Sequence, residues 1–178
     1  KLSHASVQVT NGEAVTEVLA STLAGIFMAG AEVNGKAIPT GNKPIFVIPQ
    51  DPTSIVLTPT SPVMRSGGLA STNIHAELYD ENLNVTSDGV YQVTFNVSGP
   101  GILDENLDEI PNIEGIQIST VSGTFDLPLR STEGTGDVII TATYQPLSDG
   151  NAEKQNPTIT GQTTVTVRND LALKFIPE

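Results

Sequence analysis

The sequence has no cysteine and no tryptophan, and aromatic residues make up only 4% of its 178 positions. The absence of cysteine excludes thiol catalysis, cysteine-ligated zinc and disulfide bonds together. Secreted eukaryotic domains usually carry disulfides, whereas many bacterial surface domains fold without them, so this absence favours a bacterial source. With so few rings, a hydrophobic core has to be built mainly from Val, Ile, Leu and Ala.

Basic residues are also scarce. Only 8 Lys and Arg stand against 20 Asp and Glu, which gives a formal net charge of -12. Such a surface repels phosphate backbones and anionic lipid headgroups, so we expect no nucleic-acid partner. The most apolar window, residues 18–33, is interrupted by Ser21, Thr22, Gly25, Gly30 and Glu32. Because a bilayer-spanning helix needs 18 or more apolar residues in succession, the sequence predicts no membrane-spanning segment.

Strict alternation of apolar and polar residues is the dominant pattern. It is clearest at residues 91–97, where Tyr91, Val93, Phe95 and Val97 share one face of a strand. The 16 Gly and 12 Pro residues separate further runs of the same kind. These runs are residues 54–58, 72–79, 116–119, 124–129, 138–144 and 163–167. Seven short strands at this spacing predict an all-β antiparallel sandwich.

The two parts of the chain also repeat each other. Residues 7–22 resemble residues 116–132, residues 25–33 resemble 136–144, and residues 44–48 resemble 163–167. Composition alone favours a helix at residues 13–24. However, Pro128 falls within the matching segment, and a proline inside a helix costs about 3 kcal/mol. We therefore predict a strand at residues 13–20.

A succession of strand and turn motifs carries a resemblance to a known family. The motifs are residues 54–59, 80–82, 88–90, 93–101, 123–132 and 136–142. This order resembles the bacterial Ig-like repeats of the invasin and intimin type. The chain departs from their pattern at residues 83–85, where Leu-Asn-Val replaces the usual Gly-Asn-Pro. The resemblance implies Ig-like antiparallel β-sandwiches in tandem.

The repeats define a domain organisation. Residues 1–51 are predicted to be the C-terminal half of an Ig-like domain and residues 52–169 a complete one. Residues 171–177 resemble 54–59, so 170–178 are predicted to be the first strand or linker of a following domain. A half sandwich exposes a wide apolar face, which is unfavourable unless something covers it. An N-terminal portion, a second chain and an intramolecular rearrangement are the three alternatives.

The resemblance implies a spacer or adhesive module. Our first hypothesis is a non-enzymatic structural or adhesive Ig-like repeat of a cell-surface or secreted protein or filament. Its expected partners are neighbouring Ig-like domains, copies of itself, or a host or matrix surface ligand. The alternative is an accessory module of a larger secreted enzyme acting on polysaccharide, or a phage structural protein, because similar domains occur in both. A fold does not choose between these hosts.

No catalytic, cofactor-binding or metal-binding residue is predicted. His4 and His75 are far apart in the sequence, and a zinc site needs three or four ligands. No Ser lies in a G-x-S-x-G context, so the sequence predicts no enzyme of the serine hydrolase kind.

Calcium is a separate hypothesis, since Asp80, Asn82, Asn84 and Asp88 offer oxygen ligands. An EF-hand would require Gly and Glu where the chain has Val85 and Tyr91. We therefore favour an Asx-rich turn, and retain a calcium-stiffened stalk as a third hypothesis.

Two further features concern surface contacts. An acidic loop is the best candidate contact surface, although a solvated loop is the simpler interpretation. Its acidic residues are Asp104, Glu105, Asp108, Glu109 and Glu114. Asn84 and Asn96 each begin an N-x-S/T sequon. Most of the aromatic residues, including Phe27 and Phe46, occupy alternating positions in predicted strands, and we expect them to pack in the core.

Overall fold

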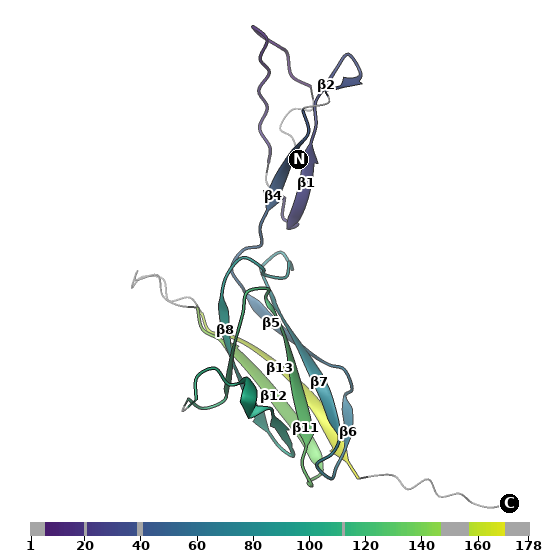
Figure 1. Cartoon of the computed structure of the whole chain (residues 1–178), viewed down its shortest axis with the longest axis vertical. Helices are drawn as coiled ribbons and strands as arrows, with labels where there is room; N and C mark the ends of the chain where they lie inside the picture. Colours follow the sequence, from purple (N-terminus) through teal and green to yellow (C-terminus); the bar gives the residue numbers. More distant parts are fainter. Residues whose placement is uncertain (1–5, 20, 39–40, 112, 147–156, 170–178) are drawn as a thin grey trace, which may run out of the picture. The chain divides into compact units, whose positions relative to one another are not determined.

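The structure is a computed structural model that describes residues 6–19, 21–38, 41–111, 113–146 and 157–169. Within these residues the chain forms β-strands and one 3-10 turn, and it forms no α-helix (Figure 1). None of its described helical structure is long and apolar enough to cross a membrane. The chain divides into two compact units, which we call unit 1 (Lys1–Pro49) and unit 2 (Gln50–Glu178). The predicted all-β fold class is confirmed.

Unit 2 is built from two sheets. The first contains, in order, β5 (Ser54–Pro59), β7 (Ser71–Tyr79), β11 (Thr124–Ser131) and β9 (Gly101–Leu103). The second contains β10 (Ile116–Thr120), β8 (Tyr91–Ser98), β12 (Gly136–Tyr144), β13 (Ile159–Arg168) and β6 (Val63–Arg65). Neighbouring strands are antiparallel except β6 and β13, which are parallel. This arrangement is an Ig-like β-sandwich.

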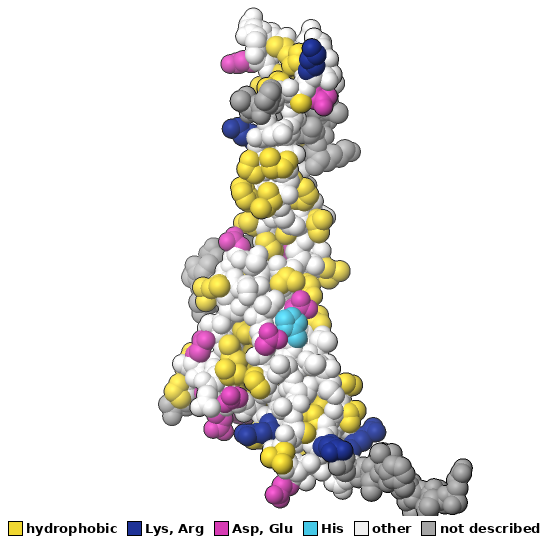
Figure 2. Space-filling model, turned by 45° about the vertical axis from the view of Figure 1, so that its right-hand side comes forward, with side chains coloured by type: hydrophobic (Ala, Val, Ile, Leu, Met, Phe, Trp, Pro, Cys, Tyr) yellow, Lys and Arg dark blue, Asp and Glu magenta, His cyan; other side chains and the backbone are white. Residues whose placement is uncertain are grey.

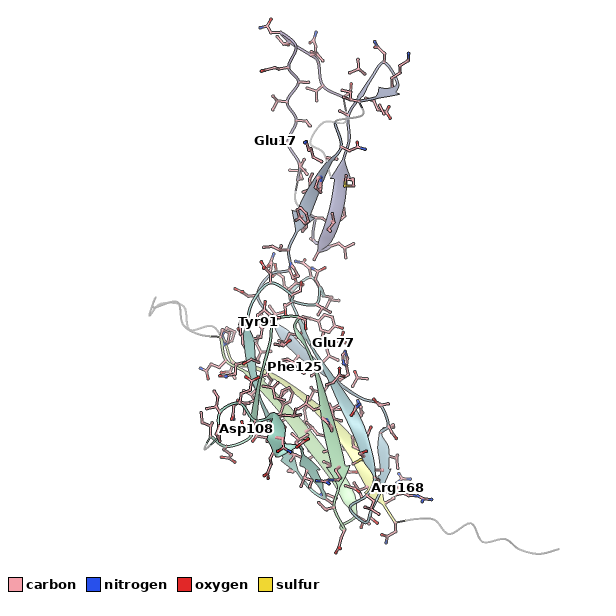
Figure 3. All side chains as sticks on the ribbon, in the orientation of Figure 1. Glu17, Glu77, Tyr91, Asp108, Phe125 and Arg168 are labelled. Carbon is pink, nitrogen blue, oxygen red and sulfur yellow. The ribbon has the colours of Figure 1, made fainter. Side chains whose placement is uncertain are left out.

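The core of unit 2 lies between the two sheets and follows from the alternation in the sequence. On β7, Ile74, Ala76 and Leu78 are fully buried. Phe125 of β11, labelled in Figure 3, comes from the sheet opposite β8. Its ring meets that of Phe95 edge to face, with ring centroids 5.4 Å apart. Each large apolar side chain buried in this way stabilises the fold by about 1.5–3 kcal/mol. A core of this kind explains how unit 2 folds without disulfides.

All seven strands predicted between residues 54 and 167 are confirmed, and most extend a few residues further than predicted. The sequence did not indicate β6 and β9. Each contains three residues, which is too short for a period of two to be recognised.

The strands described in unit 1 form two hairpins. Strand β1 (Gly25–Ala29) pairs antiparallel with β4 (Lys43–Val47), and between them β2 (Glu32–Val33) pairs with β3 (Lys36–Ala37). Asn34 and Gly35 close the smaller hairpin, with φ values of 51° and 71°. A type I′ turn needs positive φ at both positions, which Asn-Gly tolerates well. No described residue of unit 1 is buried.

The β1–β4 hairpin repeats the β12–β13 hairpin in its register. Gly25 lies opposite Val47, as Gly136 lies opposite Val167. Both glycines begin their strands with a positive φ, 148° for Gly25 and 134° for Gly136. The same pairing and the same unusual backbone conformation therefore occur in both units.

This register corrects the alignment made from the sequence. The segment that matches residues 163–167 is 43–47, not 44–48. A shift of one residue moves every side chain of a strand to the opposite face. Consequently Ile45, rather than Phe46, corresponds to the buried Val165.

The predicted strand at residues 13–20 is wrong. Among its described residues, only Glu13 and Val18 take part in isolated β-bridges, and Glu13 pairs with Thr10. In unit 2 the matching strand β11 lies between β7 and β9. The described part of unit 1 contains no counterpart of either neighbour, so this segment has no ladder to join. The predicted strand at 171–177 and His4 lie outside the described residues, and the domain boundaries remain predictions.

Candidate functional site

Asp80 organises the turn that follows β7. Its Oδ1 accepts hydrogen bonds from the backbone N–H groups of Asn82 (2.8 Å) and Asn84 (2.9 Å). Its Oδ2 accepts from the backbone N–H of Gln50 (3.0 Å) and the side-chain amide of Asn84 (2.9 Å). Burial alone would raise the pKa of this carboxyl, but hydrogen bonds from Asn84, Gln50 and Asn82 outweigh it and lower the pKa to about 2. Asp80 is therefore a structural anion within an Asx turn.

Leu83 explains how this turn forms despite its departure from the family pattern. It stands where the family has glycine and adopts a φ of 63°, in the left-handed region that glycine occupies without strain. Its side chain is 78% exposed, so no packing compensates for this conformation. Leu83 therefore bears backbone strain in this turn.

The calcium hypothesis requires free carboxylate oxygens in this turn. Both Asp80 oxygens already accept N–H groups, and Asp88 lies on the exposed surface. Within the described residues, no group of three or more His, Cys, Asp or Glu is arranged to hold a metal ion. The sequon residue Asn84 is also buried, with 8% of its surface exposed, so a glycan there would disrupt the turn. The other sequon residue, Asn96, is exposed on β8.

His75 belongs to a polar cluster on the outer face of β7 and β11. Its Nδ1 lies 2.9 Å from the Asp126 carboxylate, directly across the strand pair (Figure 2, cyan). Its Nε2 lies 3.8 Å from Glu77, which accepts a hydrogen bond of 2.9 Å from the Tyr79 hydroxyl. That hydrogen bond raises the pKa of Tyr79. The cluster lies on an open sheet face, and His75 is half-exposed there.

The acidic loop is held against β10 by two of its own residues. Asp104 caps the short turn η1 (Glu105–Leu107) by accepting from the Asn106 N–H. The Asp108 carboxylate accepts from the backbone N–H of Gln117 at 3.0 Å. Gln117 is only 2% exposed, and its side-chain amide donates to the carbonyl of Glu114. Asp108 and Glu114 therefore hold the loop against β10 through Gln117.

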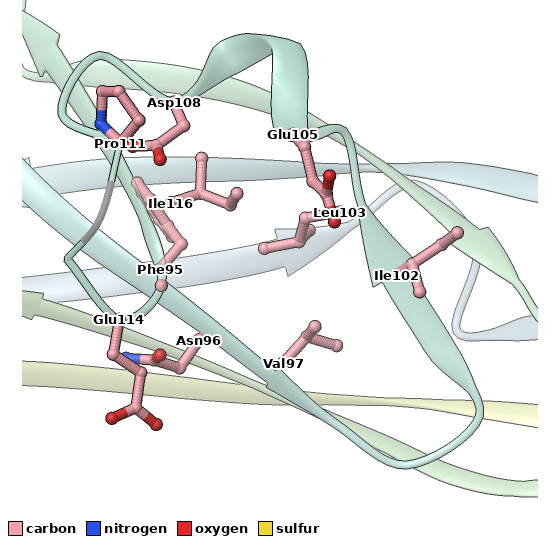
Figure 4. A pocket seen from close by; sticks show the side chains of 11 residues that line it. Phe95, Asn96, Val97, Ile102, Leu103, Glu105, Asp108, Pro111, Glu114 and Ile116 are labelled. Atoms are coloured by element: carbon pink, nitrogen blue, oxygen red, sulfur yellow. The ribbon is translucent and has the colours of Figure 1, made fainter.

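A hollow of about 550 Å³ lies beneath this loop (Figure 4). Its floor is apolar and includes Phe95, Leu103 and Ile116, and its rim carries carboxylates. Three of the five predicted acidic residues line it, namely Glu105, Asp108 and Glu114, whereas Asp104 and Glu109 do not. An apolar floor with an acidic rim can accept a group that is cationic at one end and apolar along its stem. The lining contains no His, Ser or Lys, so its three carboxylates are the side chains there that could act as a nucleophile or base.

Aromatic side chains of unit 2 pack in two pairs, whereas Tyr79 lies on the outer face of β7, and Phe27 and Phe46 of unit 1 are not buried as predicted. Phe95 and Phe125 form one edge-to-face pair, and Tyr91 and Tyr144 form another with centroids 5.8 Å apart. Phe46 is instead 67% exposed on the outer face of β4. The sequence prediction for Phe46 was wrong because the face of a strand depends on its register, which is visible only once β1 and β4 are paired.

Comparison with known proteins supports the fold. No protein-family model and no curated protein matches the chain. Among solved structures, a glycosyl hydrolase family 2 member from Bacteroides cellulosilyticus matches with a TM-score of 0.55 and 18% identity, over 90% of this chain and 21% of that chain. A beta-glycosidase from Bacteroides vulgatus matches with a TM-score of 0.54 and 17% identity, over 90% and 19%. The Escherichia coli adhesin FdeC matches with a TM-score of 0.46 and 15% identity, over 84% and 42%. The chain thus spans about a fifth of the two glycosidases, and at these identities the likeness concerns the fold.

Proposed function

We propose that this chain is a non-enzymatic structural or adhesive part of a tandem Ig-like array in a cell-surface or secreted protein. The observation that supports it is the repeated hairpin. Gly25 and Val47 in unit 1 reproduce the pairing and the positive φ of Gly136 and Val167 in unit 2. Such a repeat arises from duplication of a whole module, and stacked modules of this kind serve as spacers or contact surfaces.

In this proposal, residues 1–51 are the back half of a module of the same type as unit 2. Unit 1 has described counterparts of β12 and β13, and its Phe27 is the counterpart of Val138. Val138 is fully buried, whereas Phe27 is 37% exposed. Strands equivalent to the front half of unit 2 would complete this face, in line with the resemblance to invasin- and intimin-type repeats.

The two carboxylate-rich regions of the described residues can serve as contact surfaces. They occur on the acidic loop and on the open face of β7 and β11, where a partner can reach their side chains. We therefore propose that these surfaces make contacts and do not catalyse a reaction.

A second candidate is an accessory module of a larger secreted glycosidase. It is favoured by the two Bacteroides enzymes, whose matched parts are about a fifth of their chains. A matched part this small fits a module that accompanies a separate catalytic domain.

The complete gene distinguishes the two candidates. Further Ig-like modules on either side of this chain would support the array, whereas a single glycosidase catalytic domain in the same polypeptide would overturn it in favour of the second candidate. In parallel, the purified chain should release no product from a panel of nitrophenyl glycosides. Turnover that is lost when the Glu105 and Asp108 carboxylates are replaced would contradict the non-enzymatic proposal.

A further inference from the structure

One face of the β1–β4 sheet carries large apolar side chains that are exposed to solvent. Its members are Ile26 (68% exposed), Met28 (64%), Phe46 (67%) and Ile48 (62%), which we call the outer patch. Ile26 and Phe46 lie directly opposite each other, and Met28 and Ile48 lie two residues further along their own chain segments. Figure 2 shows hydrophobic side chains gathered on unit 1 at the height where Figure 1 places β1 and β4. Few charged side chains interrupt them in this view.

The repeat shows that this face is an outer face and not part of an unfinished core. In unit 2 the counterparts of Ile26 and Phe46 are Asp137 and Thr166. Asp137 is exposed, and it accepts a hydrogen bond of 2.9 Å from the Thr166 hydroxyl. The side chains that point between the sheets of unit 2 are the alternate ones, such as Val138. Strands that complete unit 1 on the core side would therefore leave the outer patch uncovered.

The two units differ in net charge, and this difference indicates what covers the outer patch. Unit 1 holds three Lys and three Glu residues and is neutral, whereas unit 2 holds 5 basic and 17 acidic residues and carries the whole net charge of -12. A surface near zero net charge promotes association, and a strongly charged one opposes it. Two copies of the outer patch can therefore approach each other without the like-charge repulsion that two copies of unit 2 would experience.

We infer that the outer patch binds the outer patch of a second copy of this chain. The contact is isologous, with Ile26 and Phe46 of each copy packed against the same residues of the other. Four side chains are far fewer than the roughly 20 to 30 residues on each side of a stable complex, so a single contact is weak. Arrays that present many such contacts side by side multiply this affinity through their effective concentration. The single contact holds for a spacer and for an enzyme module alike and does not depend on the proposed function, whereas its multiplication rests on the proposed array.

The test compares the full chain with a variant that carries the pair found in unit 2, Ile26→Asp with Phe46→Thr. Sedimentation velocity over a wide range of protein concentration measures self-association. We expect reversible dimers in the unaltered chain and at least about tenfold weaker association in the double variant, since central apolar residues dominate such contacts. Added salt should not weaken the dimer, because the contact is apolar and contains no ion pair that salt would screen.

Two controls separate the outer patch from the rest of the exposed apolar surface. Leu69→Asp adds one negative charge at a 95% exposed apolar residue of unit 2 and should leave association unchanged. Phe27→Thr alters the opposite face of β1 and should weaken association less than the double variant does. A chain that stays monomeric at every concentration, a double variant that associates like the unaltered chain, or an equal or larger loss in Phe27→Thr overturns the inference.

Discussion

The Asp80 carboxylate accepts a hydrogen bond of 3.0 Å from the backbone N–H of Gln50, a residue thirty positions earlier in the sequence. The same carboxylate binds both backbone and side chain of Asn84. A single anion therefore fixes the start of unit 2 to the turn after β7. Four N–H donors on one buried carboxylate make this turn the most strongly organised polar contact that we observe.

Replacing Asp80 by Asn should lower the thermal stability of unit 2, because an amide cannot accept all four hydrogen bonds. The effect depends on pH. The pKa of Asp80 is about 2 in the folded chain and about 3.9 in an unfolded one. The ionised carboxylate therefore contributes its full stabilisation above about pH 4, and this contribution is lost as the pH falls through 2.

Melting curves from pH 7 to pH 1.5 test this prediction. The difference in Tm between the unaltered chain and Asp80→Asn should shrink below about pH 4. Asp88→Asn, in the exposed part of the same connection, is the matched control and should change Tm little. A Tm difference that stays constant down to pH 1.5 would contradict the role of Asp80 as an ionised hydrogen-bond acceptor.

Replacing Leu83 by Gly should stabilise unit 2. Glycine removes the steric cost of a φ of 63°, which is about 1–2 kcal/mol, and loses part of that gain through the greater freedom of the unfolded chain. We expect a net gain of about 0.5–1 kcal/mol in urea unfolding. Leu83→Ala keeps a Cβ and should bring no comparable gain, and an equal effect of the two substitutions would refute the strain at Leu83.

Removing calcium should leave the fold unchanged. Both Asp80 oxygens are occupied by N–H donors, so a cation has no free carboxylate oxygen there. Melting curves with excess chelator and with millimolar calcium should superimpose. A Tm that rises with calcium would revive the calcium-stiffened stalk.

Truncating Phe95 to Ala should destabilise unit 2 by about 3–5 kcal/mol, because a fully buried ring leaves a cavity next to Phe125. Phe46→Ala should change the free energy of unfolding by less than about 0.5 kcal/mol, since that ring is exposed. Urea unfolding of both variants measures the contrast. Equal losses would mean that Phe46 also lies in a core.

Features of the fold that depend on neighbouring residues could be predicted from the sequence, whereas features that depend on residues far apart in the chain could not. Alternation at Tyr91, Val93 and Phe95 is local, so the strand and its buried face could be read from the sequence. The prediction of a strand at residues 13–20 was wrong because a strand also needs a hydrogen-bonded neighbour, which an alternating sequence pattern does not supply. The strain at Leu83 was missed because turn rules look for glycine or asparagine at positive φ.

In the candidate sites, too, the residues could be predicted from the sequence but their arrangement could not. The acidic loop was predicted, but its hollow depends on Asp108 binding the Gln117 N–H and drawing the loop over Phe95. The outer patch depends on Ile26 lying opposite Phe46. The hollow and the outer patch both depend on contacts between residues far apart in the chain. The sequence alone shows which apolar and acidic residues are present, but not which of them come together.

Strands β1 and β4 repeat the register of β12 and β13. Disulfide trapping measures this register in solution. The chain has no cysteine, so pairs can be introduced without background. Directly opposed residues of antiparallel strands have Cα atoms about 4.5–5.5 Å apart, within the range that a disulfide spans. We predict that Ile26→Cys with Phe46→Cys cross-links rapidly and that Ile26→Cys with Val47→Cys does not. Preferential cross-linking of the second pair would shift the register by one residue, exchange the two faces and contradict the account.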